Sequence, residues 1–445
     1  MLKKISTIFA KGKTDSLRNR LIRGAVGSFG LKIAGTGLTF IRSLMFARLL
    51  GTDGLGIYAY AITWVGLLSI PATLGLPQLI VREIAIYQTQ SAWGLIRGLL
   101  RWSNQIVLIV SIVLALIAGV IAWNLQGVTN TQILLAFCVA LTSLPIACLT
   151  NLRLSAMQGL HKVVLGQLPE VLIAPLLLIL FTGSGYLILK ENLNASWVVG
   201  MHVLAVSFTF LIGAGLLNRA LPKVVKDAPP KYQARKWLSS GLPLMFLGAM
   251  HIINSQTDVL MLGALKGAEE VGIYVVVNRL ASLIVFVLMA VNSVLAPNIA
   301  SLYAEGKIDK LQRVITKSSR AVFFASCSVA GSLIVFGDWF LLLFGQEFTQ
   351  GKDALIILCI GQLVNAAAGP VGLILNMSGH ENYTAMSIGS SAILNVVLNA
   401  ILIPQSGIQG AAIATASSMV MWNIISFIWV KKKMGIDPSI IYRFK

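Results

Sequence analysis

The chain contains two stretches of about fifty residues without a single charged side chain. They cover residues 102–152 and 382–430. A membrane-spanning helix needs about 20 apolar residues, so each stretch is long enough for two spans. Polar turns at residues 124–132 and 404–407 divide each stretch into two. The sequence therefore predicts an integral membrane protein built from closely spaced helices.

The rest of the composition leaves little room for anything else. Of 445 residues, 56% are hydrophobic and 11% are charged, and the mean hydropathy is +0.82. Soluble domains carry about 25% charged residues, so a sizeable soluble domain is excluded. We predict an all-α integral membrane fold with twelve transmembrane helices. They lie at residues 24–48, 56–76, 101–123, 132–152, 163–182, 196–217, 238–264, 272–297, 320–344, 354–376, 383–403 and 408–430.

Lysine and arginine residues are distributed unevenly between the connections. If alternate connections face opposite sides, 28 of the 35 lie on the side of both chain ends, 4 lie on the other side and 3 lie within spans. Cytoplasmic connections are rich in Lys and Arg. We therefore predict a multi-pass protein of the cell membrane with cytoplasmic N- and C-termini. The formal net charge of +19 then needs no nucleic-acid partner to explain it.

The N-terminal segment and the cysteines indicate no signal peptide, disulfide or metal site. The first 23 residues lack an apolar core with a cleavage site, and their alternation of apolar residues with lysines predicts a short helix on an anionic lipid surface. The four cysteines lie in apolar stretches without a Cys/His cluster, so we expect buried free thiols and no bound metal or cofactor. They are Cys138, Cys148, Cys327 and Cys359.

An internal repeat divides the chain into halves. Residues 42–58 align without gaps on residues 258–274, with 7 of 17 positions identical at a constant offset of 216. Because the repeat unit holds six helices, an even number, both copies have the same orientation. They should be related by a pseudo-two-fold axis along the membrane normal, with a substrate path between them. We predict an N-terminal lobe at 1–217, a basic cytoplasmic linker at 218–237 and a C-terminal lobe at 238–445.

Several ionisable side chains fall inside the predicted spans. A charge at membrane depth costs from about 3 to more than 10 kcal/mol, so it usually faces a cavity or a partner. At about 1.5 Å per residue, some of these groups lie about 10 Å below the outer helix ends and others lie deeper. We expect an outer polar layer of Arg42, Asp258, Arg279 and Asp338, with Asp338 close to the interface. An inner layer contains Lys32, Glu170 and His251.

Two helices that are equivalent in the repeat each carry a polar stripe at helical spacing. The stripe of the first span is Lys32, Thr36, Thr39 and Ser43. The stripe of the seventh span is His251, Asn254, Ser255 and Asp258. Arg42 and Asp258 occupy the same position of the repeat and have opposite charges. We hypothesise that they meet across the central cavity as an outer gate.

The other groups within spans have more than one interpretation. Glu170 lies between Pro169 and Pro175, so its helix should be irregular there and leave carbonyls without donors. A carboxylate beside such carbonyls can bind a cation or a proton, which makes Glu170 a coupling candidate. His251 is either a coupling group or a hydrogen-bonded packing residue. Arg42 either faces the cavity or extends along its stem to the interface.

The sign of these charges indicates the class of substrate. A cavity that offers Lys32, Arg42 and Arg279 should attract an anion, and Arg binds phosphate through two parallel hydrogen bonds. A cavity for cationic drugs would be expected to expose unpaired carboxylates instead. Polar side chains that we assign to the same substrate cavity are Thr36, Thr39 and Asn254.

Two segments carry a resemblance to a known family. Residues 40–59 (FIRSLMFARLLGTDGLGIYA), followed by Pro77 and Arg82-Glu83, resemble the opening of Wzx-type polysaccharide-export flippases. Residues 271–280 (VGIYVVVNRL), with 296–298 and 303–306, resemble helix 8 and the next loop in the same superfamily, the multidrug/oligosaccharidyl-lipid/polysaccharide (MOP) exporters. The resemblance implies a MATE-like fold of two six-helix lobes around a cavity. The family's cavity cations match Arg42 and Arg279 by position, and Lys32 to a lesser degree.

The resemblance also implies a function. It indicates a flippase that moves oligosaccharide linked to polyprenyl (undecaprenyl) diphosphate from the inner to the outer leaflet, for O-antigen or exopolysaccharide synthesis. Rocking of the lobes would give alternating access, and polysaccharide polymerase or assembly proteins are further expected partners. The coupling ion, H⁺ or Na⁺ through Glu170 or Asp258, stays open. Lipid II flippases of the superfamily usually carry two more C-terminal helices, which disfavours that subfamily.

Two alternatives stay open. The nearest is a cation-coupled multidrug exporter of the same fold. The other is a membrane enzyme that acts on lipid-linked sugars, which would need a loop that holds an acid, a base and the substrate. The sequence shows neither a Ser/His/Asp arrangement nor a pair of carboxylates, so we predict a transporter rather than an enzyme.

Overall fold

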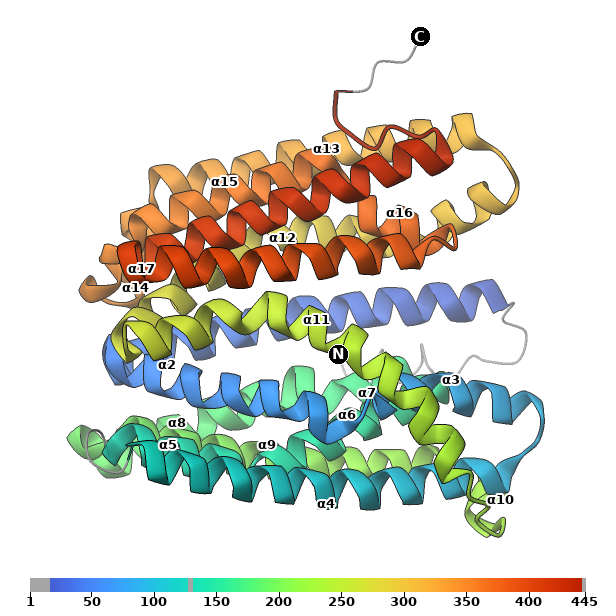
Figure 1. Cartoon of the computed structure of the whole chain (residues 1–445), viewed down its shortest axis with the longest axis horizontal. Helices are drawn as coiled ribbons and strands as arrows, with labels where there is room; N and C mark the ends of the chain where they lie inside the picture. Colours follow the sequence, from blue (N-terminus) through green and yellow to red (C-terminus); the bar gives the residue numbers. More distant parts are fainter. Residues whose placement is uncertain (1–16, 127–130, 442–445) are drawn as a thin grey trace, which may run out of the picture.

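The computed structural model describes residues 17–126 and 131–441, and all elements in these ranges are helices (Figure 1). The N-terminal half contains α2 (Leu17–Thr73), α3 (Leu76–Thr89), α4 (Trp93–Gln126), α5 (Thr131–Leu141), α6 (Leu144–Gly159), α7 (Val163–Leu168), η1 (Pro169–Ile173), α8 (Ala174–Leu189), η2 (Lys190–Asn192) and α9 (Ala195–Ala220). The predicted interfacial helix falls mostly on residues 1–16, which lie outside the described residues.

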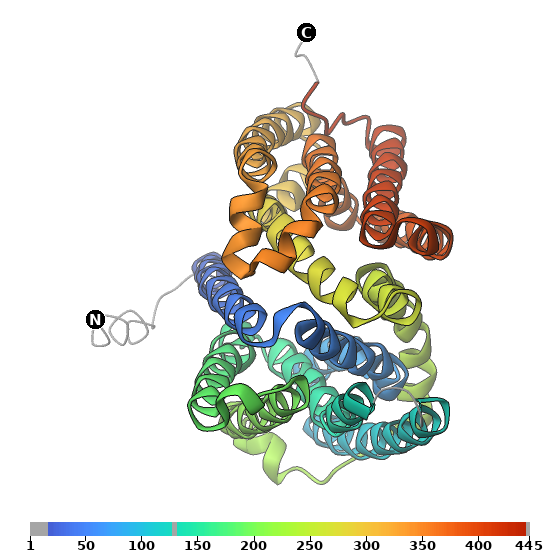
Figure 2. The same ribbon diagram turned by 90° about the vertical axis from the view of Figure 1, so that its left-hand side faces the viewer.

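The second half begins after a short connection. It contains α10 (Lys223–Asp227), α11 (Ala234–Leu265), α12 (Ala268–Ala304), α13 (Ile308–Val335), α14 (Gly337–Phe344), η3 (Gln346–Gly351), α15 (Lys352–Ala368), α16 (Val371–Met377) and α17 (Glu381–Met434). Two bundles lie one above the other, with α4–α9 in one and α12–α17 in the other (Figure 2). The long helices α2 and α11 lie between them (Figure 1).

The helices accommodate the twelve predicted spans. Within the described residues, eight helices are long and apolar enough to cross a membrane. Two of these, α2 and α17, are broken at Gly51 and Gly407, so each covers two predicted spans. The helices α11 and α12 cover the two remaining predicted spans. The predicted all-α, MATE-like fold class is confirmed, and the break at Gly407 lies in the predicted polar turn.

One predicted span ends too late. The helix α13 stops at Val335, and Asp338 lies in the first turn of the separate helix α14. The side chain of Asp338 is exposed and accepts a hydrogen bond from Lys352 Nζ at 2.5 Å. Asp338 is therefore not part of a buried polar layer, and the apolar residues 340–344 that extended the predicted span belong to α14.

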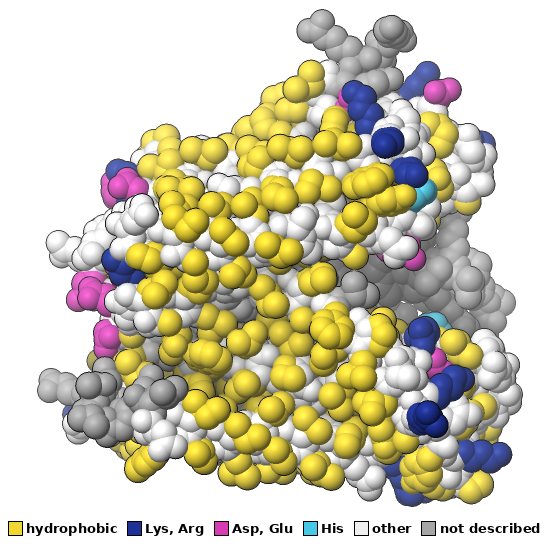
Figure 3. Space-filling view, in the orientation of Figure 1, with side chains coloured by type: hydrophobic (Ala, Val, Ile, Leu, Met, Phe, Trp, Pro, Cys, Tyr) yellow, Lys and Arg dark blue, Asp and Glu magenta, His cyan; other side chains and the backbone are white. Residues whose placement is uncertain are grey.

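The two ends of the molecule differ in charge (Figure 3). Lys and Arg gather at the right-hand end of the face shown, and Asp and Glu lie mainly at the left-hand end. We call these the basic end and the acidic end. The basic end carries the connection between α9 and α11, and the acidic end carries the breaks at Gly51 and Gly407. This separation has the form expected of a protein inserted with its basic connections on one side of a membrane.

The repeat is visible in the backbone at the acidic end. Gly51 has φ 65° and ψ −170°, and its equivalent Gly267 has φ 101° and ψ −177°. Residues with a side chain rarely adopt such positive φ values, whereas glycine adopts them without a steric penalty. The same glycine therefore turns the chain at the same place in both halves.

Close backbone contact joins the two lobes at the acidic end. A Cβ atom on Gly56 would lie 1.7 Å from the carbonyl oxygen of Ala268, and one on Gly272 would lie 1.9 Å from that of Thr52. Gly56 and Gly272 are equivalent in the repeat. Small residues allow helices to approach this closely within a membrane. Arg48 adds hydrogen bonds from its Nε and Nη2 to carbonyls at the end of α14, at 2.7 and 2.8 Å.

The helix α11 is shared between the lobes. Near its start, Trp237 Nε1 donates a hydrogen bond to the Tyr87 hydroxyl at 3.1 Å, and a Cβ on Gly75 would lie 2.1 Å from the carbonyl oxygen of Gly241. Near its end, Asp258 accepts a hydrogen bond from Asn399 of α17 at 2.7 Å. The first half of α11 therefore packs on the N-terminal lobe, and the second half packs on the C-terminal lobe.

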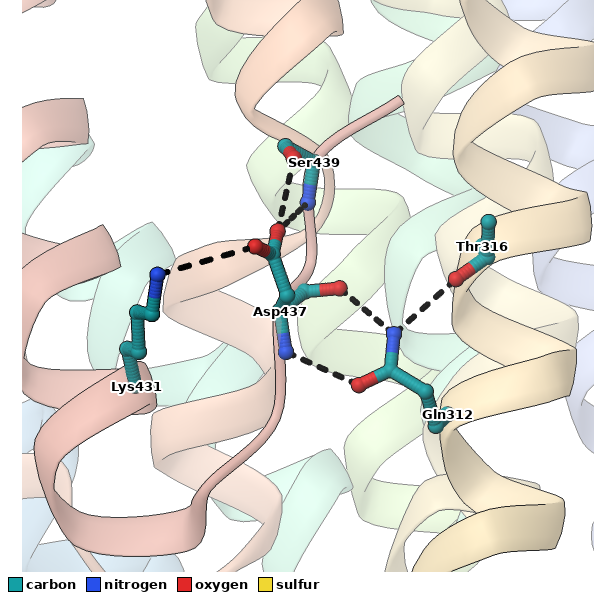
Figure 4. Close-up of polar contacts among 5 residues, drawn as sticks. All are labelled: Gln312, Thr316, Lys431, Asp437 and Ser439. Carbon is teal, nitrogen blue, oxygen red and sulfur yellow. Dashed lines mark hydrogen bonds and ion pairs between the residues drawn. The ribbon is translucent and has the colours of Figure 1, made fainter. Parts of the chain in front are cut away.

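After α17, the chain packs against α13 of the same lobe (Figure 4). Gln312 on α13 donates a hydrogen bond to the carbonyl oxygen of Asp437 at 2.6 Å and accepts one from the Asp437 amide at 2.8 Å. Ser319 donates to the carbonyl oxygen of Pro438 at 3.0 Å. These contacts hold the segment that follows α17 against α13 at the basic end.

The substitution Gly56→Ala tests the backbone contact between the lobes. The added methyl group would collide with the Ala268 carbonyl, so we expect a loss of about 1–3 kcal/mol in stability, as for other overpacked sites. Gly66→Ala is the matched control in the same helix, because a methyl group added there would meet no neighbouring atom within 4 Å. In a helix this control change should stabilise by up to about 1 kcal/mol. Thermal unfolding of the purified protein distinguishes the two, and equal shifts would contradict the contact.

Candidate functional site

A central cavity of about 350 Å³ lies between the lobes. Because α2 reverses direction at Gly51, both of its halves line the cavity, together with α11, α12 and one residue of α9. The lining residues are Arg42, Ser43, Phe46, Leu55, Tyr58, Ala59, Ile62, Thr63, His202, Ser255, Gln256, Val259, Val275, Asn278, Arg279 and Ser282. Hydroxyl and amide groups thus surround two guanidinium groups, one from each lobe.

Arg42 and Arg279 are the charged residues of this lining. The Cζ atom of Arg42 lies 5.9 Å from the centre of the Phe46 ring. The Nε atom of Arg279 is buried without a hydrogen-bond partner. Among the described residues that line the cavity there is no Asp or Glu. The structure therefore brings together the two arginines that the sequence assigned to one cavity, and it leaves their charges without a carboxylate.

His202 on α9 is a cavity residue that the sequence analysis missed. Its Nδ1 atom lies 2.8 Å from the Tyr58 hydroxyl, a hydrogen-bond distance. The Tyr58 ring is held edge-on by Phe46, with ring centres 5.0 Å apart. His202 is one histidine in an apolar helix, and no sequence pattern links it to Tyr58, which lies 144 positions away. The repeat marks Tyr58 as equivalent to Tyr274 and so drew attention to Tyr58, but it gave no indication of His202.

A second cavity, of about 290 Å³, lies nearer the basic end along α2 and α11. Its polar side chains come from α2, α3 and α6, and α11 contributes Met245, Gly248 and Ile252 to its lining. We call it the inner cavity. The polar residues are Ser69, Thr73, Gln78, Asn151, Ser155 and Gln158. They are uncharged hydrogen-bonding groups, so this cavity suits a neutral polar ligand.

Asp258 is turned away from the central cavity and into its own lobe. One carboxylate oxygen accepts hydrogen bonds from the hydroxyls of Tyr274, at 2.7 Å, and Thr415. The other accepts from the amides of Asn395 and Asn399, at 3.2 and 2.7 Å. The side chain is buried. The hypothesis of an Arg42–Asp258 gate is therefore wrong for this structure, because all four partners of the carboxylate belong to the C-terminal lobe.

Glu170 lies in the π-helical turn η1, so the predicted irregularity of its helix is present. Its Oε1 atom accepts a hydrogen bond from Arg153 on α6, forming an ion pair with side-chain exposures of 3% for Arg153 and 22% for Glu170. Glu170 is thus paired with a cation of the protein rather than left beside free carbonyls. Arg153 falls between the predicted spans 132–152 and 163–182, but the structure buries its side chain in the lobe.

Among the residues whose side chains the structure describes, the other predicted binding residues do not line the central cavity. Lys32 is exposed and lies about 15 Å nearer the basic end than Arg42 along α2. The Thr36 hydroxyl donates to the carbonyl oxygen of Lys32 at 2.8 Å. Thr39 and Asn254 do not line the described cavity either, although Ser43 and Ser255 of the same polar stripes do. The side chain of His251 lies outside the described residues. Contributions of these residues to binding stay predictions.

Comparison with known families and relatives identifies the family to which this chain belongs. The family model described as "Polysaccharide biosynthesis protein" matches residues 21–303, and the model described as "MatE" matches residues 243–401. The chain belongs to the polysaccharide biosynthesis protein family. Relatives include the probable low-salt glycan biosynthesis flippase Agl15 of Haloferax volcanii, 24% identical over 407 residues, which are 91% of this chain and 82% of the relative. The probable flippase AglR of the same organism is 32% identical over 191 residues, 42% of this chain and 40% of the relative.

Solved structures share the fold of this family member. An inward-facing multidrug resistance MATE family transporter of the MOP superfamily has a TM-score of 0.71 at 14% identity, covering 92% of this chain and 98% of its own. The lipid II flippase MurJ in an inward closed conformation has the same TM-score and identity, covering 92% of this chain and 87% of its own. These similarities confirm the MATE-like, MOP-superfamily fold predicted from the sequence.

Substitution of the buried ion pair tests whether Arg153 and Glu170 act structurally. Arg153→Met leaves Glu170 without its partner, and we expect it to destabilise the fold by about 3–5 kcal/mol. The double variant Arg153→Met with Glu170→Gln removes both charges and should recover most of this loss. Thermal unfolding of the three proteins measures both effects. A double variant as unstable as the single one would contradict a mainly electrostatic pairing.

Proposed function

We propose that this protein is a flippase that moves an oligosaccharide linked to a polyprenyl diphosphate from the inner to the outer leaflet by alternating access. The observation that carries the proposal is the pair Arg42 and Arg279, which come from different lobes and line one cavity without a carboxylate. Membership of the polysaccharide biosynthesis protein family and the flippase names of the Haloferax relatives support it.

The charge balance of the cavity favours a diphosphate. Two positive charges at membrane depth are costly unless an anion compensates them. A diphosphate that links a sugar to a lipid has two negative charges, one on each phosphate, and each guanidinium can bind a phosphate through paired hydrogen bonds. One diphosphate would therefore neutralise Arg42 and Arg279 together and would be gripped from both lobes.

The two cavities suggest how the rest of the substrate is arranged. The hydroxyl and amide groups of the inner cavity, among them Gln78, Asn151 and Gln158, suit the oligosaccharide, which is neutral or weakly charged and rich in hydroxyl groups. The polyprenyl chain would stay in the bilayer. An undecaprenyl carrier, and polymerase or assembly proteins as partners, are part of this proposal.

The proposed orientation places the basic end and both termini in the cytoplasm of a cell-membrane protein, following the positive-inside rule. The contact of Gly56 and Gly272 then closes the outer side, which corresponds to an inward-facing state that loads substrate from the cytoplasm. Carrying a negative diphosphate outward is favoured by an inside-negative potential, by about 2.3 kcal/mol per charge per 100 mV.

We propose Asp258 as the site that couples transport to a monovalent cation, either Na⁺ or H⁺. Its carboxylate is buried and faces donors that are all neutral. The Oδ1 atom of the neighbouring Asn399 is buried and has no hydrogen-bond partner. An uncompensated negative charge beside a free carbonyl oxygen suits a small cation, which would satisfy both groups.

A multidrug exporter is the alternative with the same fold. A cationic drug in the central cavity would meet Arg42 and Arg279 and no lining carboxylate, so the electrostatics oppose it. For an enzyme, the cavity would need groups that transfer protons or form covalent bonds in addition to binding. The proposed transporter needs only binding, release and movement of the lobes.

Neutralising the cavity arginines tests the proposed substrate. Arg42→Gln and Arg279→Gln each remove a charge-assisted contact worth about 1.5–3 kcal/mol, so we expect flipping to fall by about tenfold to a hundredfold. The assay is the transfer of a fluorescent polyprenyl-diphosphate oligosaccharide across the bilayer of proteoliposomes, measured by a membrane-impermeant quencher.

Arg101→Gln, at an exposed position of α4, is the matched control and should keep wild-type flipping. Export of a cationic dye should be absent from wild-type protein. Unchanged flipping in both cavity variants, or dye export that improves when the arginines are removed, would count against the proposal and favour a drug exporter.

Cation binding at Asp258 is measured by thermal stability. If the native state binds the ion, Na⁺ at about a hundred times its dissociation constant stabilises the fold by about 2.7 kcal/mol. The stabilisation should be lost in Asp258→Asn and kept in the exposed control Asp338→Asn. A parallel series without Na⁺ at decreasing pH reports the proton instead. Equal ion and pH responses of wild type and Asp258→Asn would reject this site.

A further inference from the structure

The hydrogen-bonded pair of His202 and Tyr58 faces the same cavity as the two arginines. The imidazole Nδ1 and the Tyr58 hydroxyl are 2.8 Å apart, and both residues line the central cavity with Arg42 and Arg279. Tyr58 is fixed by Phe46 and by His202 itself, with ring centres 5.0 and 5.7 Å apart. The pair therefore presents a titratable group at the place where an anion would bind.

Few groups influence the charge of His202. Its helix α9 packs against α2, α5, α6, α7, η1 and α8. From α2, Arg42 and Tyr58 line the same cavity as His202, and Tyr58 is hydrogen-bonded to it. Across the cavity lies Arg279. The uncharged titratable groups of the other packed helices are Cys138 of α5, Cys148 of α6 and Tyr186 of α8.

The remaining charges on these helices lie elsewhere. Arg153 of α6 and Glu170 of η1 pair with each other. Arg153 lies against Gly213, because a Cβ on Gly213 would be 2.5 Å from its Cζ atom. Gly213 is eleven residues beyond His202, which places the pair about 16 Å away along α9. Arg42 and Arg279 are thus the charged residues that line the cavity with His202. Burial of the imidazole and the positive charge of Arg42 both oppose a positive charge on His202 in the free protein.

A bound diphosphate changes this electrostatic balance. Its two negative charges offset those of Arg42 and Arg279, so the repulsion that opposes an imidazolium is removed and protonation becomes more favourable than in the free protein. In the neutral tautomer that carries its proton on Nε2, Tyr58 donates to Nδ1. In the imidazolium, Nδ1 donates to Tyr58, and the hydroxyl hydrogen is free to turn toward the phosphate. Protonation therefore adds both a charge and a donor to the anion site.

We propose that His202, hydrogen-bonded to Tyr58, is a proton-accepting member of the diphosphate site, so that one proton enters with the anion and leaves when it is released. This inference rests on the proposed function and extends it, because it names a third residue of the site and a proton that accompanies the substrate. Arg42 and Arg279 supply permanent charge, and His202 supplies charge only while the ligand is present.

Calorimetry with a soluble diphosphate diester tests the inference. The probe is UDP-N-acetylglucosamine, whose two phosphates stay singly charged from mildly acidic to mildly alkaline pH. Titration of the full chain in nanodiscs, in two buffers of different ionisation enthalpy, gives the number of protons taken up. We expect about one proton per ligand in the wild type, and an affinity that weakens by up to about tenfold per pH unit as the pH rises.

Variants assign the proton. His202→Gln keeps a hydrogen-bonding group next to Tyr58 but cannot titrate, so it should bind the probe with no proton uptake and no pH dependence. His161→Asn changes an exposed histidine outside the cavity and should retain wild-type uptake. Tyr58→Phe keeps the imidazole and should retain the proton while binding more weakly, which covers the case in which His202→Gln does not fold.

The outcomes separate the two proposals. Wild-type binding without proton uptake, or undiminished uptake in His202→Gln, overturns the role of His202 and leaves the diphosphate site intact. Loss of uptake in His161→Asn would also overturn it, because the proton would then bind elsewhere. Absence of probe binding in the wild type overturns both the inference and the proposed diphosphate site.

Discussion

Two helix backbones touch at the acidic end of the molecule, and the position of the cavity depends on this contact. Gly56 and Gly272 carry no side chain, so α2 and α12 approach until backbone faces backbone. Arg279 follows Gly272 by two helical turns and therefore lies about 10 Å inside the contact. Because α2 reverses direction at Gly51, the half that carries Gly56 runs back beside the half that carries Arg42, and both halves line the same cavity. The backbone contact between α2 and α12 thus brings both guanidinium groups into one small cavity.

The two halves of the repeat keep the same backbone and differ in their chemistry. Tyr58 and Tyr274 are equivalent, yet Tyr58 bonds to His202 and Tyr274 bonds to Asp258. Arg42 faces the space between the lobes, whereas Asp258 at the equivalent position is enclosed by amides and hydroxyls of its own lobe. At this one position of the repeat, the first copy therefore places a positive charge in the central cavity, and the second copy places a negative charge inside its own lobe.

Much of this architecture could be predicted from the sequence, because apolar run length, charge asymmetry and a constant repeat offset are properties of the chain alone. The common location of Arg42 and Arg279 followed from their depth and sign. The direction in which Asp258 turns did not, since it depends on Asn395 and Asn399, which lie well over a hundred positions away. His202 could not be predicted for the same reason, because its partner Tyr58 is also distant in the sequence. Prediction of the Arg153–Glu170 pair would have required knowledge of how α6 packs against η1.

The divided packing of α11 determines where bending must occur if the lobes move. Its first half is held to one body through Trp237 and Gly241, and its second half is held to the other through Asp258. If α11 were rigid, its attachment to both lobes would prevent the lobes from rotating relative to each other. Pro243 already removes one backbone hydrogen-bond donor inside this helix. Between the two attachment points, α11 lines the inner cavity with Met245, Gly248 and Ile252. A bend in this part of the helix, which changes the angle between the lobes, would therefore also change the shape of the inner cavity.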